Sequence, residues 1–129
     1  MLKSGILNPH INSLLSRVRH TNALVIADRG FPFWPQIETV DIALVDDLPC
    51  VLDVLKAIRA NFNIGNAFMA EEFRTANNAE TRLEFERALH GISLAFEPHI
   101  EFKKRVPQAI GLIRTADTVQ YANMILESA

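Results

Sequence analysis

The sequence predicts an α/β fold: a single three-layer domain, residues 1–129, with a mostly parallel sheet flanked by helices. Short apolar runs of strand length alternate with segments whose apolar residues recur at helical spacing, and this alternation is typical of parallel sheets covered by helices. The chain has 129 residues, of which 49% are hydrophobic. That is enough for one ordinary domain with one packed core, and no repeat or linker divides the chain.

Helices are predicted where apolar residues recur every three or four positions. The first begins at Pro9, because Asn8 can cap it and proline is favoured at the first helical position. We expect it to end near Arg19. The others open at Pro49, span residues 79–89, and run from Pro98 to Lys104. Their predicted inward residues are Leu52, Leu55, Ile58 and Phe62, followed by Leu83, Phe85 and Leu89.

Continuous apolar runs bounded by turn residues predict the strands. The run ALVIA at 23–27 is the clearest, and Gly30 and Pro32 follow it as breakers. The last two predicted strands have no helix between them, so they can pair antiparallel. The remaining strands are predicted at residues 39–45, 66–70, 93–96, 109–113 and 121–126.

Composition excludes several functional classes. The 13 basic and 15 acidic residues are well mixed, with a formal net charge of −2, so no basic surface for nucleic acid or an anionic membrane is expected. No apolar run approaches the roughly 20 residues of a membrane span, and the N-terminal segment lacks the apolar core of a signal peptide. Cys50 is the only cysteine, which excludes a disulfide framework and favours a cytoplasmic protein.

No motif for a nucleotide, a zinc ion or a redox cysteine pair occurs in the sequence. The four histidines have no metal-ligand spacing, so we expect no cofactor and no metal. Cys50 stands at a helix start, where a thiol pKa can be lowered, but it has no assignable catalytic partners and is interpreted as a packing residue. Glu71 and Glu72 follow a strand and either bind a cation or are simply solvated. Trp34 is either a loop anchor or a lid over a ligand.

Several polar residues lie where a ligand site would form. His20 stands in the turn before ALVIA, and Asp28 stands at the carboxyl end of that strand, where ligands gather in open α/β sheets. His99 lies in the first turn of a helix, a position that disfavours imidazolium. Tyr121 and Asn123 would share one face of a strand. Each residue taken alone also fits a structural role, as a cap, a turn former or a surface side chain.

Segments along nearly the whole chain follow the order and spacing of one known family. In these segments the sequence resembles the D-ribose pyranase / L-fucose mutarotase family. The most specific part of the resemblance is the set of His20, Asp28, His99 and YAN at 121–123. The matching segments are GILNPHI at 5–11, RHTNALVIADRGFP at 19–32, VDIAL at 40–44, MAEEF at 69–73, PHIEFKK at 98–104, LIRTAD at 112–117 and YANMIL at 121–126.

The resemblance implies a cofactor-free isomerase that interconverts the pyranose and furanose forms of D-ribose by general acid–base catalysis. L-Fucose or another aldose as substrate, and a non-catalytic sugar-binding module, are the alternatives. His20 would be the proton donor, and His99 favours ribose because the fucose branch has arginine there. The resemblance also implies a ring-shaped homo-oligomer, a decamer in the ribose branch. The implied sugar-binding residues are Asp28, His99, Tyr121, Ala122 and Asn123.

The sequence departs from the family pattern at three places near these residues. RHTN at 19–22 replaces GHTD, RTAD at 114–117 replaces RTGE, and GFPFWP at 30–35 replaces GLPIP. A further expectation concerns geometry. Five to seven extended residues span roughly 17–23 Å, so His20 and Asp28 of one chain should lie apart if the strand is fully extended. Either the strand is short and His20 folds back, or His20 meets the Asp28 of a neighbouring subunit, which is the option that the resemblance favours.

Overall fold

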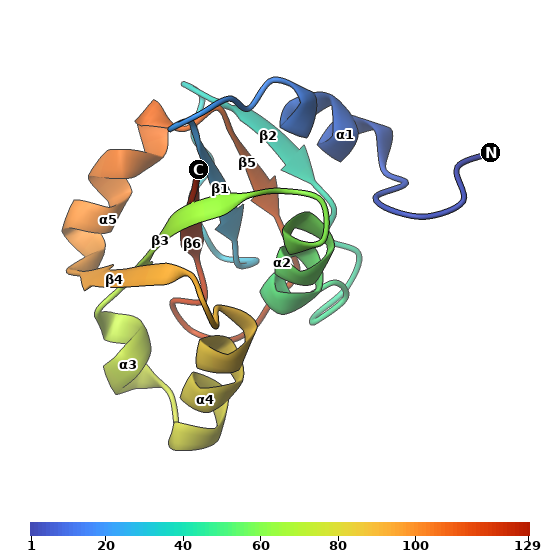
Figure 1. Ribbon diagram of the computed structural model, residues 1–129. Helices are drawn as coiled ribbons and strands as arrows, with labels where there is room; N and C mark the ends of the chain where they lie inside the picture. The colour runs from blue at the N-terminus through green and yellow to red at the C-terminus, as the bar shows by residue number, and fades with distance from the viewer.

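A six-stranded mixed sheet forms the centre of the computed structural model, which describes residues 1–129. Its strands are β1 (Ala23–Ala27), β2 (Glu38–Asp41), β3 (Ile64–Ala70), β4 (Ser93–Glu97), β5 (Gly111–Arg114) and β6 (Met124–Ser128). They lie in the order β2-β5-β1-β6-β3-β4 (Figure 1). The pairs β1–β5, β2–β5 and β3–β4 are parallel, whereas β6 runs antiparallel to both β1 and β3. The predicted mostly parallel sheet is therefore confirmed.

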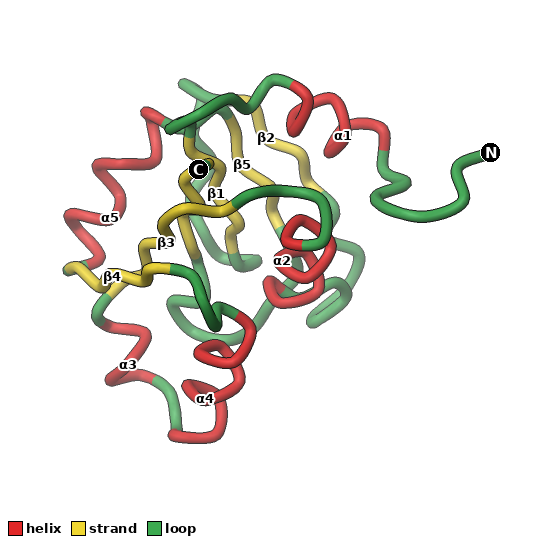
Figure 2. The backbone as a smooth tube through the Cα atoms, in the orientation of Figure 1, coloured by secondary structure: helices red, strands yellow, loops and turns green.

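Helices cover both faces of the sheet, which makes the three predicted layers (Figures 1 and 2). The α-helices are α1 (Pro9–Ser16), α2 (Val51–Arg59), α3 (Glu72–Ala76), α4 (Ala79–Ala88) and α5 (His99–Arg105), and the 3₁₀ turn η1 (Val106–Gln108) follows α5. The predicted cap of α1 is confirmed, because Asn8 Oδ1 accepts from the backbone N–H groups of His10 and Ile11. Helix α3 and the turn η1 were not predicted, because they are too short to show a helical period. None of these helices combines the length and apolar character that a membrane crossing requires.

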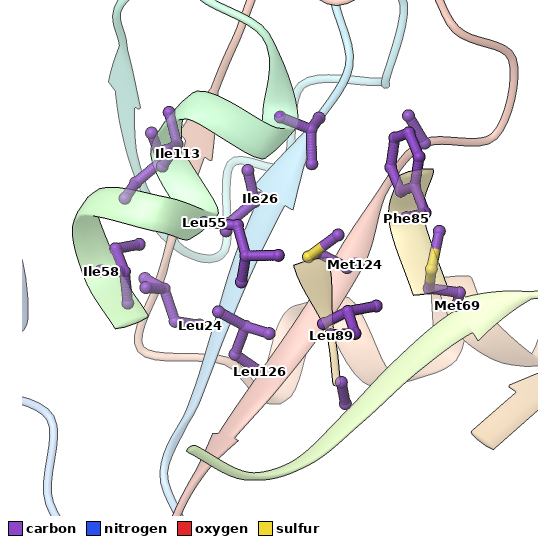
Figure 3. Packing of buried hydrophobic residues seen from close by; sticks show 14 of the residues in the cluster. Leu24, Ile26, Leu55, Ile58, Met69, Phe85, Leu89, Ile113, Met124 and Leu126 are labelled. Atoms are coloured by element: carbon purple, nitrogen blue, oxygen red, sulfur yellow. The ribbon is translucent and has the colours of Figure 1, made fainter. Parts of the chain in front are cut away.

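The central strand β1 divides the core into two parts, because its side chains alternate between the faces of the sheet. Leu24 and Ile26 belong to a large cluster with residues of α1, α2 and α4. Figure 3 shows them with Leu55 of α2 and Phe85 of α4. Val25 and Ala27 point to the other face and belong to a smaller cluster with Phe102 of α5. All four side chains are fully buried, which explains why this strand reads as a continuous apolar run.

Two elements end earlier than predicted. Helix α1 stops at Ser16, and the backbone N–H groups of Arg17 and Val18 bond three residues back, to Leu14 and Leu15, in a tightened last turn. Strand β2 ends at Asp41 instead of residue 45, because the chain leaves the sheet for a turn that pairs Val45 with Leu48. The continuous apolar run at 42–45 after Asp41 therefore did not indicate a strand.

The predicted inward faces of two helices need correction. In α2 the buried residues are Val51, Val54, Leu55 and Ile58, while the predicted Leu52 is half-buried and Phe62 lies beyond the helix end. In α4 Phe85 is buried, but Leu83 is 43% exposed. Both helices are amphipathic, but the buried face of each differs from the predicted one. In helices this short, the spacing of apolar residues defines the buried face only to within one position.

The predicted pairing of the last two strands with each other is wrong. Strands β5 and β6 flank β1 on opposite sides. The segment 115–123 crosses over the carboxyl end of β1, and Thr115 donates to the Ala27 carbonyl through both its backbone N–H (2.9 Å) and its hydroxyl (2.8 Å). This crossing carries Tyr121 and Asn123 past Asp28, and it positions the candidate site.

Candidate functional site

A cavity of about 350 Å³ lies at the edge of the sheet where β1 and β4 end and β6 begins. Since β6 is antiparallel, its first residues share an edge with the last residues of the parallel strands. Four of the six predicted site residues line this cavity. The lining residues are Asp28, Gly30, Phe31, Pro32, His99, Gln120, Tyr121 and Asn123.

Asp28 is held rigidly at the cavity floor. Its backbone N–H donates to Asn123 Oδ1 at 2.7 Å, and its carboxylate Oδ1 accepts from the backbone N–H of Gly30 at 2.9 Å. Burial raises the pKa of the Asp28 carboxyl, and the hydrogen bonds from Gly30 and Asn123 oppose this shift. The result is a carboxylate with fixed direction and reduced hydration, which suits the recognition of ligand hydroxyl groups.

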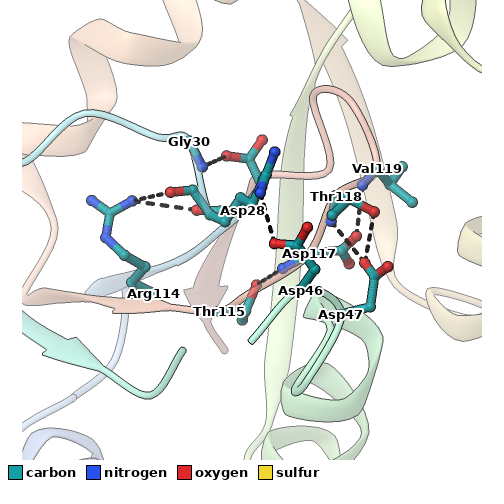
Figure 4. A network of polar contacts seen from close by, with 10 residues as sticks. Asp28, Gly30, Asp46, Asp47, Arg114, Thr115, Asp117, Thr118 and Val119 are labelled. Atoms are coloured by element: carbon teal, nitrogen blue, oxygen red, sulfur yellow. Dashed lines mark hydrogen bonds and ion pairs between the residues drawn. The ribbon is translucent and has the colours of Figure 1, made fainter. Parts of the chain in front are cut away.

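Arg114 fixes the loop that carries Asp28 (Figure 4). Its guanidinium donates to the backbone carbonyls of Asp28 (3.3 Å), Arg29 (3.4 Å) and Pro32 (3.2 Å). One side chain of β5 therefore connects the two ends of the segment 28–32, which forms one wall of the cavity. Neither the role of Arg114 nor that of Phe31 was predicted, although both lie in segments that matched the family.

His99 faces the cavity from the first position of α5, as predicted. Its imidazole stacks on Phe102 with a 14° interplanar angle and meets Phe31 and Tyr121 edge-to-face, with ring centroids 6.2 and 5.1 Å apart. Burial, with a smaller contribution from Lys103, lowers the pKa of His99. The ring is therefore mainly neutral near pH 7, and burial is the main cause.

Tyr121 and Asn123 both line the cavity, but not for the predicted reason. They precede β6, and Tyr121 has φ 56° in the left-handed region, which no strand residue adopts. Bulky residues rarely take this conformation, and such strain concentrates at functional sites. Ala122 between them is fully buried in the main core cluster and does not line the cavity.

His20 lies away from this cavity. It is exposed in the turn before β1, and the adjacent Thr21 N–H donates to the Ser128 carbonyl at the far end of β6. Asp28 is instead bonded to Asn123, just before the start of β6. The two residues thus stand at opposite ends of one β1–β6 pair, which agrees with the predicted separation within one chain.

Gln120 and Trp34 complete the surroundings of the cavity. Gln120 lines it but was not predicted, and its backbone carbonyl is held by Asn77 Nδ2 at 2.9 Å. Trp34 is not among the lining residues and packs against Phe31, with ring centroids 6.2 Å apart. Of the two interpretations of Trp34, the structure supports the loop anchor.

Asp47, Cys50 and Asp117 are the one group whose ligand atoms lie close enough for a metal ion, all within 4.8 Å of one another. Their carboxylates already accept hydrogen bonds, Asp117 from the N–H groups of Val51 and Val119 and Asp47 from Thr118 (Figure 4). Burial, followed by the nearby Asp117 and Asp47, raises the pKa of the Cys50 thiol to about 11. A neutral thiol is a poor ligand, so this group fits the role of fixing the start of α2 and the segment 115–123.

The interpretation of Cys50 as a packing residue needs correction. It is the cap residue of α2 and not a core packing residue, and its thiol donates to the Asp47 carbonyl with an Sγ···O distance of 3.2 Å. The helix start does not lower its pKa, because the effects of burial and the neighbouring carboxylates are larger.

Comparisons with known proteins agree on one family. The model of the RbsD / FucU transport protein family matches residues 1–129. A D-ribose pyranase of Geobacillus kaustophilus is 38% identical over 128 residues, covering 99% of this chain and 93% of that protein. A D-ribose pyranase of Bacillus cytotoxicus is 37% identical over 128 residues, covering 99% and 97%.

Solved structures match over the same range. Bacillus subtilis RbsD complexed with D-ribose superposes with a TM-score of 0.92 at 30% identity, covering 100% of this chain and 98% of that chain. The fucose mutarotase of Streptococcus pneumoniae in complex with L-fucose has a TM-score of 0.84 at 17% identity, covering 99% and 98%. At 17% identity, the match to the fucose mutarotase shows a common fold and nothing more.

Proposed function

Because the chain belongs to the RbsD / FucU transport protein family, we propose that it is a cofactor-independent isomerase that interconverts the pyranose and furanose forms of D-ribose. Relatives that are 37–38% identical over nearly the full chain are D-ribose pyranases. The observation that carries the proposal is the meeting of Asp28, His99, Tyr121 and Asn123 around one cavity of about 350 Å³. That volume lies in the range of small-molecule sites.

The residues of the cavity suit a sugar. Asp28 offers a fixed carboxylate that can accept hydrogen bonds from hydroxyl groups, and Asn123 offers an amide. Tyr121 presents an aromatic face or a hydroxyl, and the His99 imidazole is mainly neutral. Such a set recognises an uncharged, hydroxyl-rich ring through directional hydrogen bonds and needs no cation.

The reaction requires only proton transfers. Opening a pyranose needs a proton delivered to the ring oxygen and another removed from the anomeric hydroxyl, and closure reverses both transfers. A histidine side chain can give and take protons near neutral pH, and one such group contributes on the order of 10²–10⁴-fold. We assign the proton donation to His20, and sugar binding to Asp28, His99, Tyr121 and Asn123. Ala122, which the resemblance also implied, is buried in the core and is left out of this assignment.

This assignment requires a second subunit, because His20 and the cavity lie at opposite ends of β1. The proposed assembly is a ring-shaped homo-oligomer, a decamer, with sites at subunit boundaries. Exposed apolar side chains support an assembly, since such groups gather at interfaces. Four of them lie in the segment 33–48, where Phe33, Leu44, Val45 and Leu48 are 53–74% exposed. The single cysteine is compatible with a reducing compartment, and we place the protein in the cytoplasm.

The test is magnetisation-exchange NMR on D-ribose, with and without protein, followed by the same measurement on L-fucose. Faster exchange between the ring forms of ribose, abolished by His20→Ala, is the expected result. Faster exchange on fucose alone would assign a fucose mutarotase instead. Calorimetric sugar binding without any rate effect would indicate a binding module and exclude catalysis. Light scattering that gives the mass of a single chain would contradict the proposed assembly.

A further inference from the structure

The first residue of α5 is anchored by a side chain from another helix. The backbone N–H of His99 donates to both carboxylate oxygens of Glu72, at 3.0 and 3.1 Å. Glu72 is the first residue of α3 and is half-buried. Its neighbour Glu71 points elsewhere, pairing with Arg74 at 3.6 Å. The two glutamates therefore differ in role, and only Glu72 reaches the site.

The anchor is needed because α5 has no cap of its own. Its cap position is occupied by Pro98, whose side chain has no hydrogen-bonding atom. The first N–H groups of a helix lack partners within the helix and need an external acceptor. Glu72 supplies that acceptor to His99, so the place of the imidazole at the cavity depends on α3.

The ring of His99 has a preferred protonation form. Its Nδ1 atom is buried and has no hydrogen-bond partner, whereas Nε2 is not among the buried unpaired atoms and the ring lines the cavity. A proton on Nδ1 would be a buried donor without an acceptor, which is costly. A proton on Nε2 leaves Nδ1 as a buried acceptor without a donor, which proteins tolerate more often than an unpaired N–H, and makes the imidazole a hydrogen-bond donor toward the cavity.

Four charged or titratable groups face His99 from the elements around it. Glu72 of α3 and Asp28 after β1 favour the imidazolium, while Lys103 of α5 disfavours it. Tyr121, before β6, contacts the ring edge-to-face. Burial and the unpaired Nδ1 atom oppose the charged form, and together with Lys103 they outweigh the two carboxylates.

We propose that Glu72 is a positioning residue of the sugar site: it holds the backbone of His99, whose neutral imidazole donates a hydrogen bond from Nε2–H toward the cavity. The inference rests on the proposed function in that the ligand is a sugar. Glu72 itself does not line the cavity. It acts through the backbone of His99, and its charge also shifts the proton equilibrium of the ring.

Two variants separate these effects. Glu72→Gln keeps an oxygen that can accept from the His99 N–H but removes the charge, so D-ribose affinity by calorimetry should stay within about twofold while the pKa of His99 falls. Glu72→Ala removes the acceptor as well, and the affinity for D-ribose should fall about tenfold, the weight of one hydrogen bond to a charged group. Glu71→Ala is the matched control and should leave both properties unchanged.

The protonation form is read directly by ¹⁵N NMR of the imidazole in the whole protein, without sugar. The expected signals at pH 7 are those of a neutral ring protonated on Nε2. Protonation on Nδ1, an imidazolium at pH 7, or unchanged ribose affinity in folded Glu72→Ala would overturn the proposal. If Glu72→Ala does not fold, an unchanged His99 pKa in Glu72→Gln would do so. Wild-type protein that binds no D-ribose would refute the proposed function, while the NMR result would still decide the role of Glu72.

Discussion

The side chain of Asn123 accepts a hydrogen bond from the backbone N–H of Asp28, with an N···O distance of 2.7 Å, although 95 positions separate them in the chain. Asn123 is 3% exposed, so this bond is shielded from water. It joins the loop before β6 to the end of β1 and thereby sets the distance between the two walls of the cavity.

Replacing Asn123 by alanine should therefore reduce both stability and sugar binding. The Asp28 N–H would lose its acceptor in a partly buried place, at a cost of about 1–3 kcal/mol. We expect the urea midpoint of unfolding and the affinity for D-ribose to fall together. Asn123→Asp keeps the acceptor oxygen but adds a charge beside Asp28, and it should raise the pKa of Asp28 further. Wild-type stability in Asn123→Ala would show that the bond is not a structural link.

Asp28 should make the protein less stable as the pH rises. Its pKa is raised by burial above the ordinary value of 3.8, so the folded state binds this proton more tightly than the unfolded chain does. Its contribution to stability is therefore fully present below about pH 3.8, declines as the pH rises to the raised pKa, and stays at its lowest level above it.

Asp28→Asn should remove this penalty, because the amide stays neutral and keeps an oxygen for the Gly30 N–H. The variant should be more stable than the wild type at pH 7 and equal to it near pH 3, as measured by urea unfolding at both pH values. It should also lose sugar isomerisation, since stability and activity often oppose each other at such sites. A variant that is no more stable at pH 7 would show that burial of the charge carries no cost here.

Gly111, the first residue of β5, tests the packing of α1 on the sheet. A Cβ atom there would lie 2.6 Å from Leu14 Cδ1 and 3.1 Å from the Glu38 carbonyl oxygen. Gly111→Ala should destabilise the protein by about 1–3 kcal/mol through overpacking. Leu14→Ala should also destabilise it alone, but the double variant should be more stable than the sum of the two changes predicts. Additive free energies of unfolding would mean that the two residues do not compete for space.

The sequence predicted the fold well where one physical signal dominated. The run at 23–27 is buried on both faces of the sheet, and a central strand of this kind is apolar at every position. The order of β5 and β6 could not be predicted, because it depends on the segment 115–123 crossing over the end of β1. That crossing rests on hydrogen bonds from Thr115 to Ala27, between residues far apart in the chain.

In the candidate site, too, residues with local sequence signals were predicted, and residues that depend on contacts between distant segments were not. Asp28 and His99 were placed correctly, since strand ends and helix starts have local sequence signals. Tyr121 and Asn123 were assigned to a strand, but both precede β6, and Tyr121 has a positive φ. Glu72 and Arg114 bind backbone groups of other segments. Such contacts join residues far apart in the chain, so the local sequence pattern does not predict them.

In the proposed assembly, His20 and Asp28 of one site come from different chains. In one chain His20 lies beside the far end of β6, and Asp28 lies beside its start. If a neighbouring subunit supplies His20, then His20→Ala and Asp28→Asn damage the same site from different chains. Each variant alone should be inactive.

Coexpression of the two inactive variants should restore activity. In randomly mixed homo-oligomers, about one quarter of the boundaries would combine an intact His20 with an intact Asp28, so ring-form exchange of D-ribose should return to about one quarter of the wild-type rate. Native mass spectrometry verifies that mixed oligomers form, and a mixture of His20→Ala with the double variant His20→Ala/Asp28→Asn is the matched control, which should stay inactive. Mixed oligomers without activity would place His20 and Asp28 of each site in the same chain, and the turn at 19–22 would then have to refold to reach the cavity.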